Sequence, residues 1–381
     1  MPDSSLEDDL ARIDPELHAE LRAWGMDEAR LEGWAAELLH TGPGANRVTG
    51  TVSGPEPGDI DELPEPGSQE HRRLEAAGLE ALSRGELAMV VLAGGMATRM
   101  GGVVKALVEA LPGVTFLDAR LAEQEHWHSV SGASLPMWLM TSYATDGPIR
   151  EALGGRLDGD TLAAFRQGVS LRLTPEGRLF LEDDGRPSLH ATGHGDLPDA
   201  LRASGLLTRF VKRGGRYVWI VNLDNLGAAV DPAVLGWHID HGASLTVEVV
   251  EKTGDVGGIP ARLDGRPVVL EDFRLPEVFD GDSVPYFNTN TFLCDAAVLE
   301  HLEPAWSWFR VEKTVDDRPA IQFERLVGEL TSWLDSRFLL VPREGAASRF
   351  LPAKSWDDLE LSRPLIAARL EPFLAQNRDA S

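Results

Sequence analysis

The sequence has little cysteine, few basic residues relative to acidic ones, and no long hydrophobic run. Its 381 residues include a single cysteine, Cys294, so no disulfide can form within the chain, which fits a reducing cytoplasm. Acidic residues outnumber basic residues by 61 to 36, and the formal net charge is −25. This balance argues against nucleic acid or an anionic membrane surface as a partner, because both attract basic proteins. No apolar stretch approaches the roughly 20 residues of a transmembrane helix, and the acidic N-terminus does not resemble a signal peptide.

What is present is the composition of a globular protein with a full core. Hydrophobic residues make up 43% of the chain and charged residues 25%, and the length suits one large α/β domain with additions or two modest domains. The negative charge would repel a polyphosphate substrate. A site for such a substrate therefore needs its own cluster of Lys, Arg and metal.

The N-terminal part is expected to be helical and then extended. Helical spacing of apolar residues predicts helices within residues 1–40, from Leu6, Leu10, Ile13, Leu17 and Leu21 and then from Leu31, Trp34, Leu38 and Leu39. Residues 41–67 are rich in Gly and Pro without a hydrophobic period, which predicts a connector or an extended arm on the surface. With a short helix over about 70–83, residues 1–85 form a predicted N-terminal helical segment and linker.

Strands and helices then alternate along the chain. Buried strands are expected at 88–92, 136–141, 217–221 and 245–250, with helices at 118–130, 196–212 and 231–241. This order predicts an α/β fold with a doubly wound, mostly parallel, Rossmann-like sheet. DGR turns at 184–186 and 264–266 predict antiparallel hairpins. We expect a catalytic domain over 86–335 and a small C-terminal α/β region over 336–381.

A glycine-rich loop follows the first predicted strand. Residues 92–102 read LAGGMATRMGG, and Lys105 comes shortly after. Glycines let backbone N–H groups approach an anion without a Cβ in the way, and ligands of open α/β sheets bind at the carboxyl ends of strands. Arg99 and Lys105 supply the positive charge that the rest of the chain lacks. The residues expected to contact a nucleotide are Leu92, Ala93, Gly94 and Gly95.

A carboxylate closes another predicted strand. The motif NLDN at 222–225 follows the strand at 217–221, and it places Asp224 at the edge where ligands bind. Mg²⁺ needs only one or two protein carboxylates when phosphates and waters complete its octahedron. Asp224 is therefore the predicted metal ligand.

Further motifs occur in the order of a known family. They are FRQG at 165–168, GHGD at 193–196, EKT at 251–253, FNTN at 287–290 and SRFLPAK at 348–354. Together with the glycine loop and NLDN, they cover roughly residues 60 to 360. The chain resembles the UDP-sugar pyrophosphorylase family, which includes eukaryotic-type UTP–glucose-1-phosphate uridylyltransferases and UDP-N-acetylglucosamine pyrophosphorylases. The resemblance implies a GT-A-like nucleotidyltransferase sheet, UTP and a sugar 1-phosphate as substrates, and Mg²⁺ as cofactor.

The resemblance also implies where each substrate lies. Gln167 would read uracil, a task that suits an amide because it donates and accepts at once, and Gly193 would lie against the base. His194 would lie near the sugar, and Asn222 would contact the sugar phosphate. The other residues implied are Asn290 for the sugar hydroxyls, and Lys252 and Lys354 for the sugar phosphate and the α-phosphate.

Two other interpretations stay open. GHGD and FNTN favour glucose, but a pocket differs between sugars by only a few contacts, so N-acetylglucosamine or galactose 1-phosphate is an alternative. The second is a non-catalytic paralogue that binds a UDP-sugar. It is supported by Val103-Val104, which stands where the family usually has Gly-Pro or Tyr-Pro before the lysine. The short C-terminal region lacks the terminal β-helix of some family members, which is consistent with a monomer.

Overall fold

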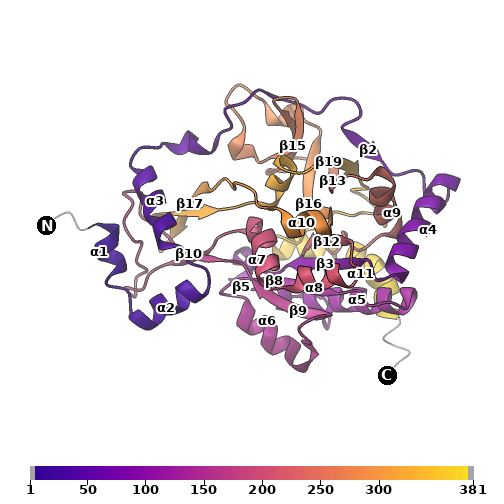
Figure 1. Ribbon diagram of the computed structural model, residues 1–381, viewed down its shortest axis with the longest axis horizontal. Coiled ribbons are helices and arrows are strands. Elements are labelled where there is room, and N and C mark those ends of the chain that lie inside the picture. The colour runs from indigo at the N-terminus through magenta and orange to yellow at the C-terminus, as the bar shows by residue number, and fades with distance from the viewer. Residues whose placement is uncertain (1–4, 376–381) are drawn as a thin grey trace.

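A mixed eight-stranded sheet forms the centre of the computed structural model, which describes residues 5–375 (Figure 1). Its order is β2-β19-β13-β16-β12-β3-β8-β9, and only β16 runs antiparallel to its neighbours. The strands are β2 (Ile60–Glu62), β3 (Leu87–Leu92), β8 (Met137–Thr141), β9 (Leu162–Arg166), β12 (Tyr217–Asn222), β13 (Leu245–Glu251), β16 (Tyr286–Asp295) and β19 (Ser336–Leu340). The four strands predicted from apolar runs are all present, and the mostly parallel α/β sheet is confirmed.

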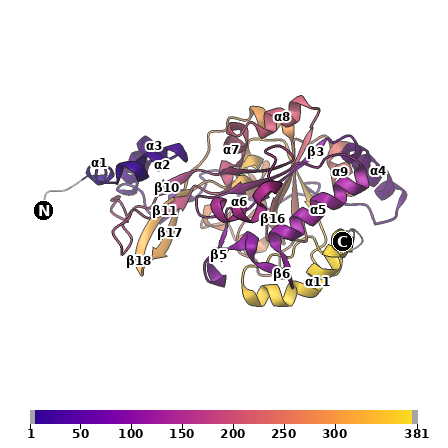
Figure 2. The same ribbon diagram turned by 90° about the horizontal axis from the view of Figure 1, so that it is seen from below.

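Helices cover both faces of this sheet. One face carries α4 (Gln69–Ser83), α5 (Phe116–Ser131), α6 (Asp146–Leu153), α9 (Pro232–His241) and α11 (Trp356–Ala375), and the other carries α7 (Leu197–Ala203), α8 (Leu206–Lys212) and α10 (Ala296–His301). Figure 2 shows α8 and α11 on opposite sides of the sheet. Alternate side chains of β12 enter the two cores, with Trp219 on the α9 side and Ile220 on the α8 side. Among the described residues, none of the helices has the length and apolar character needed to cross a membrane.

The helical stretch expected over 196–212 is present as two helices. Gly205 adopts the left-handed conformation, with φ +72°, and divides the segment into α7 and α8. A left-handed residue ends the hydrogen-bond ladder of one helix, and glycine adopts that conformation without a steric penalty. The apolar period continued across the break and therefore did not reveal it.

Three N-terminal helices lie at one end of the molecule, away from α4 and α9 (Figures 1 and 2). They are α1 (Leu6–Leu10), α2 (Pro15–Ala23) and α3 (Glu28–Leu38), as the apolar spacing predicted. They share a hydrophobic core with two small hairpins. These hairpins consist of β10 (Val169–Leu171) with β11 (Leu189–Ala191), and β17 (Phe309–Val315) with β18 (Arg318–Glu324).

The extended arm and the predicted C-terminal region each contribute a strand to the central sheet. β1 (Val52–Ser53) joins the hairpin of β14 (Ile259–Leu263) and β15 (Arg266–Leu270), which turns at the predicted DGR. β2 from the predicted N-terminal part and β19 from the predicted C-terminal region are both strands of the central sheet. α11 packs on α5 and on β6 (Glu109–Leu111), which pairs with β7 (Val114–Thr115). The three-part division drawn from the sequence therefore crosses the sheet.

Candidate active site

A cavity of about 540 Å³ opens where β3, β8 and β12 end. One wall, the strand-end wall, consists of residues that follow these strands and β9. The opposite wall, the hairpin wall, consists of Arg172, His190, Lys313, Gln322 and Glu324 from in and around the two small hairpins. The predicted site residues that line the cavity are Leu92, Gly94, Gly95, Lys105, Gln167, Gly193, His194, Asn222 and Asp224. Nine residues predicted from four motifs therefore line the same cavity.

Gly94 and Gln167 lie against each other in the lining of the cavity. A Cβ on Gly94 would lie 2.0 Å from Gln167 Nε2, so only glycine leaves room for the amide at this position. The backbone N–H of Gln167 donates to Thr141 O at 2.9 Å, which fixes the residue beside the end of β8. Its side-chain Oε1 is buried and has no hydrogen-bond partner among the described residues. A buried acceptor of this kind is costly unless a ligand supplies a donor.

Lys105 and Asp224 also meet in the lining of the cavity. The hairpin of β4 (Met96–Ala97) and β5 (Val103–Val104) delivers Lys105, whose Nζ donates to Asp224 Oδ2 in an ion pair. The Asp224 side chain is 18% exposed and that of Lys105 16%, so both groups remain accessible from the cavity. The motif residues predicted to share one nucleotide are in direct contact.

A bulge in β16 turns Asn290 toward the same place. Between Glu248 and Val249 of β13 the register shifts, so that two residues of β16 have no partner on β13. Asn290 there has φ +58°, and its N–H donates to Asn288 Oδ1 at 3.0 Å. Its Nδ2 then donates to Asn222 Oδ1 at 2.8 Å. The bulge thus aims a side chain at the site, and the two predicted sugar-side asparagines are hydrogen-bonded to each other.

His194 is a neutral imidazole. The Val327 N–H donates to its Nδ1 at 3.0 Å, which places the ring proton on Nε2. Burial lowers the pKa of His194 to about 4, so it carries no charge near neutrality. Before it, Gly193 has φ +95°, and a Cβ there would lie 2.4 Å from Arg325 O. The GHGD loop is therefore held tightly against the chain that follows β18.

The remaining predicted residues do not line the cavity. Arg99 and Lys354 have exposed side chains, and Ala93 is buried behind the loop. Lys252 Nζ donates to Asp282 Oδ1 at 2.7 Å and to Gly281 O at 3.2 Å.

The SRFLPAK segment nevertheless lies beside the NLDN motif. Leu351 N donates to Asn225 Oδ1 at 2.8 Å, and Asn225 Nδ2 donates to Arg349 O at 3.1 Å. Because Asn225 directly follows Asp224, these two bonds hold the chain leading to Lys354 close to the predicted metal ligand.

The hairpin wall was not identified from the sequence. Arg172 Nε donates to Gln322 Oε1 at 2.8 Å, and Gln322 Nε2 donates to Glu324 Oε1. His190 Nδ1 lies 3.0 Å from Ala191 O, while its buried Nε2 has no partner among the described residues. Burial lowers the pKa of His190 to about 3, so the ring is neutral. Arg172 and His190 stand in or beside three-residue strands, and the other three residues stand in the regular hairpin of β17 and β18, outside the motifs identified in the sequence.

Glu271 is a second residue that the sequence did not reveal. A Cβ on Gly258 would lie 2.8 Å from Glu271 Oε1 and 3.2 Å from Asn288 Nδ2, so this carboxyl group lies beside the strand that carries Asn290. Burial raises the pKa of Glu271 to about 7.

Asp224 suits a single hard cation. Among residues 5–375, no three His, Cys, Asp or Glu side chains are grouped as metal ligands. One accessible carboxylate at the edge of a cavity is the donor set that Mg²⁺ uses when phosphate oxygens and water complete its shell.

Comparisons with known proteins agree with this geometry. Residues 57–373 match the model of the UTP–glucose-1-phosphate uridylyltransferase family. A UTP–glucose-1-phosphate uridylyltransferase of Astragalus penduliflorus is 31% identical over 294 residues, which cover 72% of this chain and 61% of the relative. That of Musa acuminata is 30% identical over 311 residues, 77% of this chain and 66% of the relative. The chain thus spans about two thirds of the length of these relatives or less.

Solved structures give the same result. A UDP-glucose phosphorylase of Trypanosoma brucei superposes with a TM-score of 0.74 at 25% identity, over 91% of this chain and 77% of that one. A mutant UDP-glucose pyrophosphorylase from Leishmania major, in complex with UDP-glucose, has a TM-score of 0.61 at 27% identity, over 73% of this chain and 65% of that one. With the family model matching most of the sequence, the chain belongs to the UTP–glucose-1-phosphate uridylyltransferase family.

Proposed function

We propose that the protein transfers the uridylyl group of UTP to glucose 1-phosphate, which yields UDP-glucose and pyrophosphate. One observation supports this most directly: a buried amide oxygen without a partner among the described residues and a Lys–Asp ion pair line the same cavity. The Gln167 Oε1 accepts the N–H of the uracil ring, and its NH₂ group donates to a uracil carbonyl. The base thus lies beside Gly94 and Gln167 in the active-site cavity, and the triphosphate extends toward Lys105.

Charge neutralisation is the central task of the phosphate end. Lys105 would leave Asp224 for the phosphates when UTP binds, and Asp224 would then be the carboxylate available to hold Mg²⁺. When bound, the ion supplies Lewis-acid neutralisation of the phosphate charge. Arg99 and Lys354 have exposed side chains that can turn toward the departing pyrophosphate and the α-phosphate. Lys252 can exchange Asp282, which is 91% exposed, for the sugar phosphate.

The reaction is an in-line displacement. An oxygen of the sugar phosphate forms a bond to the α-phosphorus of UTP, the bond from that phosphorus to the bridging oxygen of the β-phosphate breaks, and pyrophosphate leaves with the electron pair. The attacking phosphate is already ionised near pH 7, so no general base is needed. Positioning and electrostatic stabilisation therefore supply the catalysis. His194 with a proton on Nε2, and the pair Asn222 and Asn290, supply neutral donors on the sugar side.

A coupled assay of pyrophosphate release tests this function. Purified protein would be given UTP and Mg²⁺ with glucose 1-phosphate, N-acetylglucosamine 1-phosphate or galactose 1-phosphate in turn. We expect the highest kcat/KM with glucose 1-phosphate and no turnover after chelation of Mg²⁺ by EDTA. Preference for another sugar would change the substrate. Binding of UDP-glucose without turnover of any sugar would instead indicate the non-catalytic paralogue.

Three further parts of this proposal concern the molecule as a whole. We propose that its sheet is of the GT-A-like nucleotidyltransferase kind, that the protein acts in the cytoplasm, and that it is a monomer. The last two are tested by fractionation of cells and by light scattering of the purified protein.

A further inference from the structure

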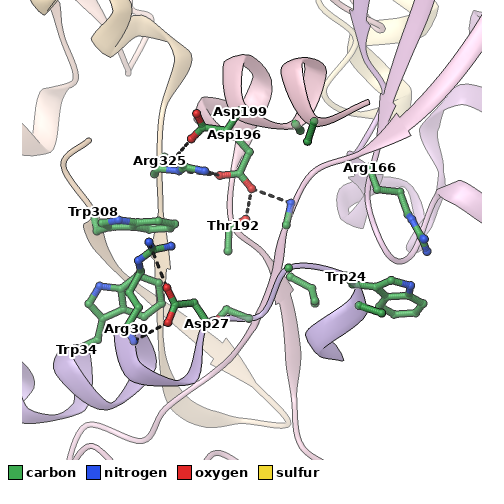
Figure 3. Close-up of a pocket in the computed structure, with 17 residues that line it drawn as sticks. Trp24, Asp27, Arg30, Trp34, Arg166, Thr192, Asp196, Asp199, Trp308 and Arg325 are labelled. Carbon is green, nitrogen blue, oxygen red and sulfur yellow. Dashed lines mark hydrogen bonds and ion pairs between the residues drawn. The ribbon is translucent and has the colours of Figure 1, made fainter. Parts of the chain in front are cut away.

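A second cavity of about 330 Å³ lies directly behind the residues proposed to read the base (Figure 3). We call Arg166–Gly168, with Gln167 at its centre, the base-reading segment. Gln167 lines the active-site cavity, whereas Arg166 and Gly168 line the second one. The other side of the second cavity is formed by the turn between α2 and α3 and by the chain after β18. The residues that line this cavity therefore include those that support the base-reading segment on the side away from the active site.

The N-terminal helices contact the segment on both sides of Gln167. The Arg166 guanidinium lies over the Trp24 ring, 5.1 Å from its centroid. Next to Trp24, Gly25 has φ +91°, and a Cβ there would lie 4.0 Å from Gly168 Cα. Figure 3 shows Trp24 and Arg166 side by side at one end of the cavity. The turn after α2 thus lies against the segment without itself reaching the active-site cavity.

Asp196 holds the segment from the other side. One of its carboxylate oxygens accepts from the Gly168 N–H at 2.7 Å and from the Thr192 hydroxyl. The other accepts from Arg325 Nε at 2.7 Å, and Arg325 also donates to Asp199 Oδ2 at 2.7 Å. The Asp196 side chain is only 4% exposed. Without Arg325 it would be a buried carboxylate with two neutral donors, which is costly.

The Arg325 backbone holds the GHGD loop as well. Gly195 N donates to Arg325 O at 2.9 Å, and Arg325 N donates to Thr192 O at 2.8 Å. The Arg325 side chain is therefore bonded to Asp196, which supports Gly168. The Arg325 main chain is bonded to Thr192 and Gly195, on either side of Gly193. The two parts of the proposed uracil site meet at Arg325.

Aromatic rings connect this arginine to α3. The Arg325 guanidinium lies 4.7 Å from the centroid of Trp308 and 5.4 Å from that of Trp306. Trp308 in turn contacts Trp34 of α3, with ring centroids 4.7 Å apart, and Arg30 of α3 lies over Trp308 at 5.0 Å. A guanidinium between aromatic faces is held in orientation as well as in place. Through Trp308, the position of α3 therefore influences the position of the Arg325 guanidinium.

We propose that Arg325 and Trp24 are positioning residues for base recognition, through which the N-terminal helices fix the orientation of Gln167. The inference rests on the proposed function, in which Gln167 reads uracil. Neither residue lines the active-site cavity, so they set base selectivity and do not take part in phosphoryl chemistry.

The test compares kcat/KM for UTP and for CTP in full-length variants with glucose 1-phosphate. In Arg325→Met, which keeps the bulk but not the charge, we expect the UTP-to-CTP ratio to fall about tenfold, because a small misplacement of a recognising group is costly. Arg325→Lys should restore part of the ratio, and Trp24→Ala should lower it about threefold, since it releases only Arg166. The loss should appear in KM for UTP more than in kcat.

Arg262→Met is the matched control. Arg262 makes two bonds of 2.7 Å to Asp59, whose side chain is 7% exposed, and neither residue lines either cavity. Both methionine variants should lose similar thermal stability, but only Arg325→Met should lose base selectivity. An unchanged ratio in Arg325→Met, or an equal fall in Arg262→Met, would overturn the inference. If Arg325→Met does not fold, the ratio in Trp24→Ala decides in the same way. Absence of activity in the unmodified protein would instead contradict the proposed function.

Discussion

The two walls of the active-site cavity are built in different ways. The strand-end wall takes its residues from loops that directly follow β3, β8, β9 and β12, so the parallel sheet brings them together at one edge. The hairpin wall takes Lys313 and Gln322 from a separate hairpin that packs on the N-terminal helices. In the strand-end wall, a residue that comes directly after a strand of the sheet is placed at the cavity by the sheet itself. In the hairpin wall, the position of a residue along the chain does not predict that it reaches the cavity.

This difference extends to the polar groups. In the strand-end wall, Gln167 Oε1 lacks a partner within residues 5–375 and Asp224 is paired with Lys105, a cation that can move to a phosphate, so each is available to a ligand. In the hairpin wall, Arg172 and Gln322 are already bonded to other protein groups. His190, whose Nε2 has no partner among the described residues, is a neutral ring, and Lys313, likewise unpaired there, is exposed to solvent. We infer that the strand-end wall carries the chemistry, and that the hairpin wall mainly closes the cavity.

The largest effect is expected from the ion pair of the strand-end wall. Asp224→Ala or Lys105→Ala should lower kcat by about two to three orders of magnitude. Each variant removes a charged group that is already in place where negative charge develops on the phosphates. Steady-state kinetics with saturating UTP measures this, and circular dichroism should show an intact fold. Asp240→Ala, which removes an exposed aspartate paired with Arg73, is the control. Near-normal turnover in either site variant would remove the strand-end wall from catalysis.

A smaller but more specific effect is expected at Gly94. The Cβ of Gly94→Ala would meet chiefly Nε2 of Gln167, the far end of a flexible side chain, so the amide can move aside at little cost in stability. The amide then no longer faces the base, and KM for UTP should rise about tenfold or more. Gly95→Ala adds the same atom where no described protein atom lies within 4 Å, and it should cost less. Equal KM values in the two variants would show that Gln167 does not read the base.

The strand-end wall was predictable because its signals are local. The apolar run ending at Leu92 and the glycines after it placed a loop at the sheet edge, and NLDN placed Asp224 beside it. The contact of Asn290 with Asn222 depends on a bulge in β16 that no local pattern marks. The break at Gly205 was not evident because the apolar period of the segment continues across it. The bulge in β16 and the helix break at Gly205 are determined by the packing of the folded chain, and no sequence motif marks them.

The titration of Glu271, beside the strand that carries Asn290, should affect stability. Because the folded-state pKa of Glu271 is raised to about 7, the folded protein binds this proton more tightly than the unfolded chain does. The contribution of Glu271 to stability is therefore fully present below about pH 4 and is lost as the pH rises to 7, by about 3 kcal/mol. Glu271→Gln should remove this loss, and urea unfolding at pH 5 and pH 8 measures it. A variant no more stable than the unmodified protein at pH 8 would contradict the buried titration.

The smallest effect is expected from the hairpin wall itself. Lys313 is exposed, lines the cavity, and its side chain makes no hydrogen bond or ion pair within residues 5–375, so its charge is available to a phosphorylated substrate. Lys313→Ala should raise KM for UTP or the sugar phosphate by about threefold at low ionic strength, and less at about 0.5 M salt, because an exposed charge is screened. Arg318→Ala, at the start of the same hairpin's second strand but outside the cavity lining, is the control. A fall in kcat as large as that of Lys105→Ala would place catalytic charge on both walls, and the division between them would no longer hold.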